Sequence, residues 1–194
     1  MARSSRKTTA PEAIEMLIED HRKVQKMFKQ FEKMKDEGDE QEKRELVEQT
    51  CAELKVHTQI EEEIFYPAAR EGLEEGDLVA EALVEHASAK QLIEQLEAMD
   101  GGGETFDATF IVLGEYVNHH ITEEQNEMFP KLKKAELDWD ALAAEMQQRK
   151  HELQEELGLG AAEEAEEAET DEDEGSKERV RREAPRGRRS TAAK

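Results

Sequence analysis

Apolar residues recur three and four positions apart along four long segments of the chain, with polar residues between them. Because such positions share one face of an α-helix, the pattern predicts amphipathic helices over about residues 11–36, 41–69, 78–99 and 106–133. Glycine-containing turns separate the segments, and the run Asp100-Gly-Gly-Gly103 suits a helix end. We therefore expect an all-α protein, built as an up-down four-helix bundle.

A fifth apolar stripe follows the four segments and predicts an additional C-terminal helix over about residues 138–157. Its apolar positions are Leu142, Met146, Leu153 and Leu157. A helix with one apolar face needs a surface to cover. This helix either covers one side of the bundle or packs on another subunit.

The predicted organisation has four parts. Residues 1–10 form a basic leader, residues 11–135 the bundle, residues 136–160 the additional helix and residues 161–194 a charged tail. The tail is first acidic and then basic. Leader and tail are expected to be disordered, because neither can bury enough apolar surface to offset the entropy of ordering. We expect the tail to act mainly as a solubilising segment, with a protein-binding role as the alternative.

Two phrases of the sequence repeat at a fixed distance. His57-x3-Glu61 returns as His120-x3-Glu124, and the same shift of 63 positions aligns the prolines that end both phrases. Residues four apart lie on one face of a helix, so each phrase projects an imidazole beside a carboxylate. The apolar stripe on the face of the first phrase is expected to consist of Leu46, Val47, Leu54, Ile64, Phe65 and Ala68.

A single histidine also lies in the helical segment before each phrase. His21 and His86 align at a shift of 65 positions, so each half of the chain is a helix with one histidine followed by a helix with His-x3-Glu. This duplication predicts a pseudo-two-fold bundle with one site between its halves. A buried carboxylate needs a counter-charge or a metal. The sequence therefore predicts a metal site made of His21, His57, Glu61, His86, His120 and Glu124.

The donor set indicates which metals are suitable. Imidazole and carboxylate ligands without thiolate favour iron, manganese or zinc over copper. Four imidazoles and two carboxylates are more than one ion needs, and they suit two ions bridged by Glu61 and Glu124. One ion would take His21 and His57, and the other His86 and His120.

Other histidines and carboxylates near the phrases are expected to lie outside this site. His119 is rotated by about 100° from His120 around the helix, which places it off the apolar stripe. His151 lies in a charged run and is expected on the surface. Glu62, Glu63 and Glu123 are expected to be solvated, although a neighbouring carboxylate could swing in as an extra ligand.

Charge and composition exclude several classes of protein. The formal net charge of −22 argues against a general binder of nucleic acid or of anionic membranes. The single cysteine, Cys51, excludes an intrachain disulfide. No apolar run approaches the length of about 20 residues that spans a membrane, and the start lacks the apolar stretch of a secretory signal. We expect a cytoplasmic protein.

The pattern His, His-x3-Glu, His, His-x3-Glu resembles the bacterial hemerythrin-like family, which is also called the HHE cation-binding domain. The resemblance covers about residues 12–135. It rests on two phrases: Leu54-Lys-Val-His-Thr-Gln-Ile-Glu-Glu-Glu-Ile-Phe-Tyr-Pro67 and His119-His-Ile-Thr-Glu-Glu-Gln-Asn-Glu-Met-Phe-Pro130. It implies a non-haem di-iron centre that binds O₂ reversibly or reacts with O₂, peroxide or nitric oxide.

The sequence departs from oxygen-carrying hemerythrins at two positions. Those proteins have a further histidine one turn after the ligand of the third helix, where this chain has Lys90, and an aspartate as one bridge, where this chain offers Glu124. One imidazole fewer leaves an additional coordination position for water or another ligand. The resemblance therefore implies redox turnover or sensing more than stable O₂ carriage.

Three functions remain open at this stage. The first is a di-iron protein that binds or senses O₂ or related oxidants, in oxidative stress or iron handling. The second is a di-iron enzyme with catalase-like, peroxidase-like or ferroxidase activity, and the third a structural metal with a partner-binding tail. We expect two iron ions as cofactor ahead of manganese or zinc, with no specific nucleic acid and no membrane as partner. The oligomeric state stays open.

Overall fold

The structure is a computed structural model, and it describes residues 11–34, 38–73, 76–99 and 101–159. The predicted leader, residues 1–10, and the whole of the predicted tail, residues 161–194, lie outside the described residues. Each regular element within the described ranges is helical, and all of these elements belong to one unit, Met1–Leu157. No helix in the described ranges is both long and apolar enough to cross a membrane.

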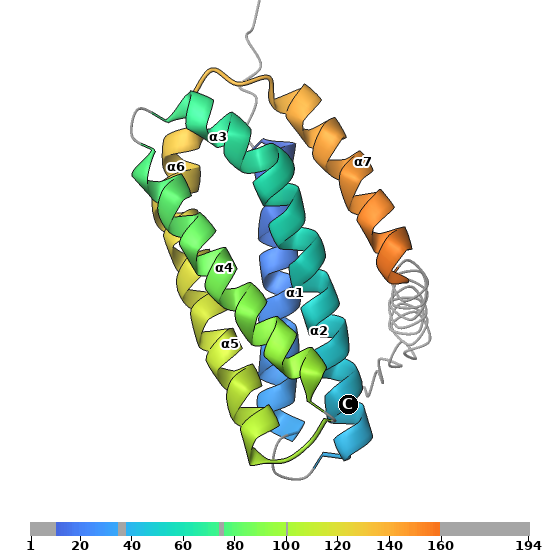
Figure 1. The fold of residues 1–194 in the computed structure, drawn as a ribbon. Helices are drawn as coiled ribbons and strands as arrows, with labels where there is room; N and C mark the ends of the chain where they lie inside the picture. Colours follow the sequence, from blue (N-terminus) through green and yellow to red (C-terminus); the bar gives the residue numbers. More distant parts are fainter. Residues whose placement is uncertain (1–10, 35–37, 74–75, 100, 160–194) are drawn as a thin grey trace, which may run out of the picture. The chain divides into compact units, whose positions relative to one another are not determined.

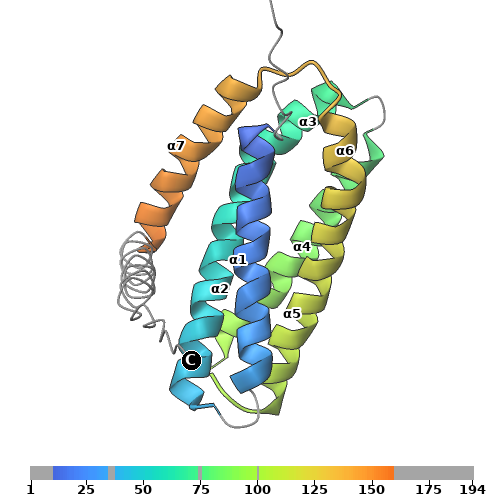
Figure 2. The ribbon, with the colours of Figure 1, turned by 180° about the vertical axis from the view of Figure 1, so that it is seen from behind.

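Four long helices form the bundle: α1 (Glu12–Met34), α2 (Glu40–Ile60), α4 (Asp77–Ala98) and α5 (Glu104–Glu123). Helices α1 and α4 each pack against both α2 and α5, which closes a ring of four (Figure 1, Figure 2). Successive helices run in opposite directions, as short connections require. The prediction of an all-α helical bundle is confirmed.

A cluster of buried apolar side chains from all four long helices fixes the rotation of each helix. The ring of Phe110 on α5 contacts Phe31 and Phe28 on α1, with centroid distances of 4.6 and 4.9 Å. Val47 and Leu54 on α2 and Ile93 on α4 are buried in the same cluster. Because these residues follow the predicted stripes, burying them turns the four histidines of those stripes inward as well.

Two of the long helices contain a turn of π-helix at matching positions. Helix α2 continues through η1 (Glu61–Phe65) into α3 (Tyr66–Gly72), and α5 continues through η2 (Glu124–Met128) into α6 (Phe129–Leu132). Both π segments begin at the glutamate of a His-x3-Glu phrase. A π turn brings residues five apart onto one face and is frequent at functional sites.

The π turn corrects one part of the predicted stripe. Ile64 and Ala68 were expected in the core, and both are only half-buried, whereas Tyr66 and Ala69 are buried. The extra residue in the turn rotates everything that follows it around the helix axis. The prediction for Ile64 and Ala68 was therefore wrong.

Helix α7 (Trp139–Leu157) packs against α1, α2 and η1 and covers one side of the bundle (Figure 2). Leu142, Met146 and Leu153 are buried as predicted, while Leu157 at the helix end is 45% exposed. The guanidinium of Arg149 also binds the Glu63 carboxylate at 2.7 Å. Of the two placements considered for this helix, the structure shows the one on its own bundle.

Candidate metal centre

Four buried imidazoles meet in two pairs inside the bundle. Nε2 of His21 on α1 lies 3.1 Å from Nε2 of His57 on α2. Nε2 of His86 on α4 lies 3.2 Å from Nε2 of His120 on α5. All four residues are at most 6% exposed. The sequence-predicted histidines thus come together, with one pair from each half of the repeat.

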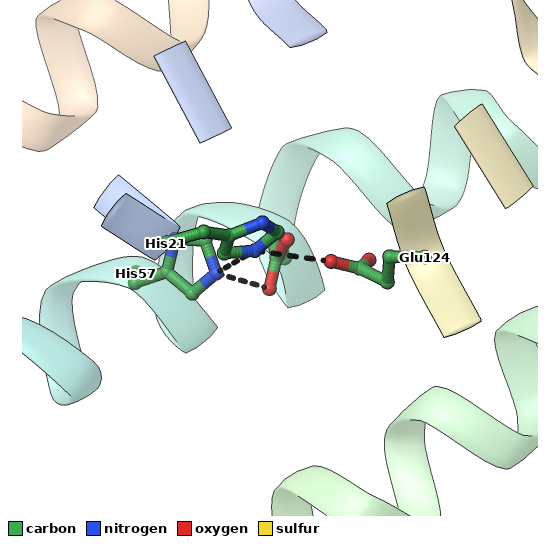
Figure 3. A group of neighbouring side chains, drawn as sticks. His21, His57 and Glu124 are labelled. Atoms are coloured by element: carbon green, nitrogen blue, oxygen red, sulfur yellow. Dashed lines mark hydrogen bonds and ion pairs between the residues drawn. The ribbon is translucent and has the colours of Figure 1, made fainter. Parts of the chain in front are cut away.

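The two predicted carboxylates lie between these pairs. Oε2 of Glu61 is 3.3 Å from Nε2 of His57 and 3.3 Å from Nε2 of His86. Oε2 of Glu124 is 3.3 Å from Nε2 of His21 (Figure 3) and 3.5 Å from Nε2 of His120. Each carboxylate therefore contacts one imidazole of each pair, which is the placement expected of a bridging ligand.

The six side chains leave part of their hydrogen-bonding capacity unused, and bound metal ions would use it. Oε1 of Glu61 is buried without a hydrogen-bond partner among the described residues, and Oε2 of Glu124 has imidazole nitrogens nearby but no hydrogen bond of good geometry. Buried carboxylate oxygens in this condition are costly. The predicted ligands form two groups, and within each group one ligand atom of every residue lies within 4.8 Å of the others. The groups are His21, His57, Glu61 and Glu124, and Glu61, His86 and His120. Nitrogen and oxygen donors at this spacing suit two cations.

The electrostatics show what the chain does before it binds metal. Burial, and then the nearby Glu124, raise the pKa of Glu61 well above its usual range, so this carboxyl holds a proton. Burial alone would also raise the pKa of Glu124, but His21 and His120 lower it instead. Burial, followed by repulsion from His120, lowers the pKa of His86 to about 2. The His86 imidazole is therefore neutral and ready to donate its lone pair.

The outer nitrogen of every imidazole in the centre is held by a second side chain, which fixes the direction of Nε2. Sequence analysis assigned this role to none of the four side chains, and it named only Glu62 among them, as a solvated residue or an extra ligand. The repeat was the available signal, since two of them precede His21 and His86 and two follow Glu61 and Glu124. The Nδ1 partners are Gln125 for His21 at 3.0 Å, Asp20 for His57 at 3.5 Å, Glu62 for His86 at 3.0 Å and Glu85 for His120 at 2.8 Å.

Tyr66 is a further residue of the centre that sequence analysis missed. Its buried hydroxyl donates to Oε1 of Glu124 at 3.1 Å and lies 3.2 Å from Nε2 of His86. Five residues after Glu61, it would point away on a regular α-helix, and the π turn brings it onto the same face. Its repeat counterpart is Phe129, which stacks on His21 at a centroid distance of 6.0 Å. The signal available in the sequence was that the repeat aligns a tyrosine, Tyr66, with a phenylalanine, Phe129.

Other expectations for nearby residues have mixed outcomes. The side chains of His119 and His151 are 67% and 75% exposed, as predicted. Glu62 was expected to be solvated, and this was wrong, because its carboxylate holds both His86 and the ammonium of Lys90. Lys90 therefore binds Glu62 at 2.6 to 2.7 Å and adds no ligand to the centre.

A small cavity of about 20 Å³ lies beside the four imidazoles. That volume is enough for a water-sized molecule. Glu85 and the half-exposed Tyr116 are among the residues that line it. The apolar part of its lining is Val24, Leu54, Ala89, Val117 and Ile121.

Comparisons with known proteins agree with this geometry. The family model described as hemerythrin HHE cation binding domain matches residues 12–132. A DNA nickase from Nostoc sp. (strain PCC 7120 / SAG 25.82 / UTEX 2576) is 28% identical over 141 residues, which cover 72% of this chain and 39% of the nickase. This chain thus spans well under half of that relative. No solved structure matches this chain significantly.

Proposed function

This chain belongs to the hemerythrin HHE cation-binding family, and from that premise we propose that it holds two iron ions and binds O₂ or a related small oxidant. One observation carries the proposal: two pairs of buried imidazoles share two buried carboxylates. The six donors fall into two groups that share Glu61, and this grouping suits two ions bridged by Glu61 and Glu124 better than one ion.

The two metal positions are defined by their histidines. In the proposal the first position lies between His21 and His57, and the second position lies between His86 and His120. Burial lowers the pKa of His21 and of His86, so these imidazoles are ready to supply lone pairs, whereas Glu61 and His120, whose pKa values are raised, give up protons when a cation arrives. Bound iron would supply the electrons and open coordination positions that chemistry with O₂ or peroxide requires.

The surroundings of the centre suit a small uncharged oxidant. The cavity beside the imidazoles has an apolar lining, which admits a diatomic molecule and excludes bulk water. Burial, followed by the nearby Glu61 and Glu124 carboxyl groups, raises the pKa of Tyr66 well above its usual range, so its hydroxyl keeps its proton and can donate a hydrogen bond.

A second candidate function is peroxide disproportionation or oxidation of Fe²⁺ at the same centre. The observation that favours it concerns Lys90, which stands where oxygen-carrying hemerythrins have a further histidine. Lys90 binds Glu62 instead of a metal, so two ions would share four imidazoles. A centre with fewer nitrogen donors has more positions open to substrate. Turnover of hydrogen peroxide by the iron-loaded protein, compared with a Glu61→Gln variant, separates this candidate from simple binding.

The DNA-cleaving activity named for the Nostoc relative is not carried over to this chain. The match covers only 39% of that protein. The formal net charge of this chain is −22, which opposes contact with a polyanion. The proposal is therefore confined to the metal centre.

Metal content is the direct test of the dinuclear centre. Protein loaded with Fe²⁺ without oxygen and then desalted is expected to hold about two irons per chain. Exposure to O₂ should then change the near-ultraviolet and visible absorption. A reproducible plateau at one iron per chain would contradict the bridged pair, and an unchanged spectrum would contradict O₂ binding.

Filling the cavity is expected to separate oxidant binding from metal binding. Ala89 lines the cavity and is 7% exposed, so Ala89→Leu should occupy the space at a cost of about 1–3 kcal/mol in stability. Iron content should persist, while the spectral change with O₂ becomes slower or smaller. Ala87→Leu on the exposed face of the same helix is the matched control. Equal O₂ responses in the two variants would show that the cavity is not the binding space.

A further inference from the structure

The side chains that hold the outer nitrogens of the four histidines differ between the two metal positions. The repeat places these side chains at equivalent points, yet it does not keep their chemistry. Gln125 in the second half corresponds to Glu62 in the first. This single difference between an amide and a carboxylate makes the surroundings of the two positions unequal.

The first position has little net negative charge around its histidines. Nδ1 of His21 faces the amide of Gln125 at 3.0 Å. Nδ1 of His57 faces Oδ2 of Asp20 at the longer distance of 3.5 Å. The other oxygen of Asp20 binds the ammonium of Lys150, which α7 contributes. One carboxylate and one ammonium sum to zero.

The second position has two carboxylates at shorter distances. Nδ1 of His86 is 3.0 Å from Oε1 of Glu62, and Nδ1 of His120 is 2.8 Å from Oε2 of Glu85. Lys90 offsets the charge of Glu62. Besides His120, the partner of Glu85 among the described residues is the exposed His119, at 3.6 Å. Two carboxylates and one ammonium leave one negative charge more than at the first position.

Tyr66 adds a second difference of the same kind. Its hydroxyl lies 3.2 Å from Nε2 of His86, so the second position has an additional oxygen within reach. The equivalent side chain at the first position is the ring of Phe129 on His21, which carries no donor atom. Both differences therefore favour a cation at the second position.

We infer that the second position binds a divalent metal ion more tightly and fills before the first. This inference rests on the proposed dinuclear centre. A carboxylate that accepts a hydrogen bond from Nδ1 makes the opposite nitrogen a better ligand, and an amide oxygen does so less. When His21 binds a cation, its Nδ1 carries the proton, so the Gln125 amide turns to present its oxygen. The extra negative charge also attracts the cation through a poorly polarisable interior.

A calorimetric titration of the metal-free full-length protein with Co²⁺ tests the inference. We expect two binding steps, with dissociation constants that differ by about tenfold or more. Gln125→Glu should tighten the weaker step by about tenfold, because it gives His21 a carboxylate partner. Glu62→Gln should weaken the tighter step by a similar factor. Helix content from circular dichroism confirms that the variants fold.

Two matched controls separate contact from charge. Asn126→Asp adds the same charge as Gln125→Glu one residue away, at an exposed position, and Glu63→Gln removes the same charge as Glu62→Gln beside it. Both should leave the two steps nearly unchanged. Gln125→Glu behaving like Asn126→Asp would overturn the inference, because the partner of His21 would then not matter.

Removing one histidine from each position assigns the steps. His21→Ala should abolish the weaker step and His86→Ala the tighter one. The reverse assignment, or equal affinities in the unaltered protein, would overturn the inference while leaving the dinuclear centre intact. Binding of fewer than two ions by the unaltered protein would instead contradict the proposed function.

Discussion

Chelation of both ions from the loaded protein is expected to lower its thermal midpoint by about 10 °C at neutral pH. Ligand at about a thousand times its dissociation constant stabilises a folded chain by roughly 4 kcal/mol, and 1 kcal/mol shifts the midpoint of a chain of this size by about 2–4 °C. The chain should stay largely helical, because the apolar cluster that includes the phenylalanines of α1 and α5 contains none of the six metal-site residues. Thermal melts by circular dichroism measure both quantities.

The same difference in midpoint should grow as the pH rises from about 5 to about 7.5. Without metal, Glu61 has a pKa raised by burial, so its contribution to stability is present below the unfolded pKa of about 4.3 and is lost as the pH rises through the folded value. With metal, the ionised carboxylate is paired with a cation. Rising pH therefore weakens the metal-free form at this residue and strengthens metal binding.

His86 acts on the metal-free form in the opposite direction. Burial, aided by His120, lowers its pKa to about 2, so its contribution to stability is present above the unfolded pKa of about 6.5 and is lost as the pH falls through the folded value. Because His86 stays neutral in the folded chain, it does not lower metal affinity near neutrality. Burial would lower the pKa of His120, but its hydrogen bond to Glu85 and the nearby Glu124 outweigh burial and raise it. Glu61 and His120 are therefore the residues expected to release protons when metal binds.

Glu61→Gln is the variant that isolates this effect. Glutamine matches the shape of a protonated glutamate, so the midpoint of the metal-free protein should change little. The stabilisation by metal should fall sharply, because a neutral amide bridges two cations poorly. Gln59→Glu, two residues earlier on the same helix, is a control for a general effect of charge. Equal melting of metal-free and loaded wild-type protein would show that these residues are not a buried metal site.

His120→Ala is expected to remove at least one of the two bound irons, while the adjacent His119→Ala leaves metal content nearly unchanged. Nε2 of His120 faces the second position beside His86 and Glu124. The side chain of His119 is 67% exposed and contacts Glu85 and Glu123 at the surface. Iron per chain, measured by elemental analysis after desalting, gives the comparison directly.

The pair of variants is informative because the two histidines differ only in their place around the helix. A modest effect of His119→Ala would follow from its contact with Glu85, which holds Nδ1 of His120. That effect should be far smaller than the loss of a ligand. Greater damage from His119→Ala would mean that α5 is rotated by one residue from the arrangement described.

The sequence by itself determined the helices and the inward-facing donors. Helical periodicity is local, so the apolar stripes that carry His21 and His86 specify which faces are buried whatever the neighbours are. The duplication then selected His120 over His119, because only His120 aligns with His57. The six predicted residues meet in the structure for this reason.

Two features were decided by the tertiary structure alone. One is the helix register after Glu61 and Glu124, and the other is the set of side chains that hold the outer nitrogens of the histidines. Helical periodicity does not predict the π turn that begins at Glu61. Because of this turn, Tyr66 is buried and Ile64 is only half-buried. The contact of Lys150 with Asp20 joins residues 130 positions apart, and it exists only because α7 lies on α1. Interactions between distant segments depend on how faces meet in space, and a one-dimensional pattern does not contain that information.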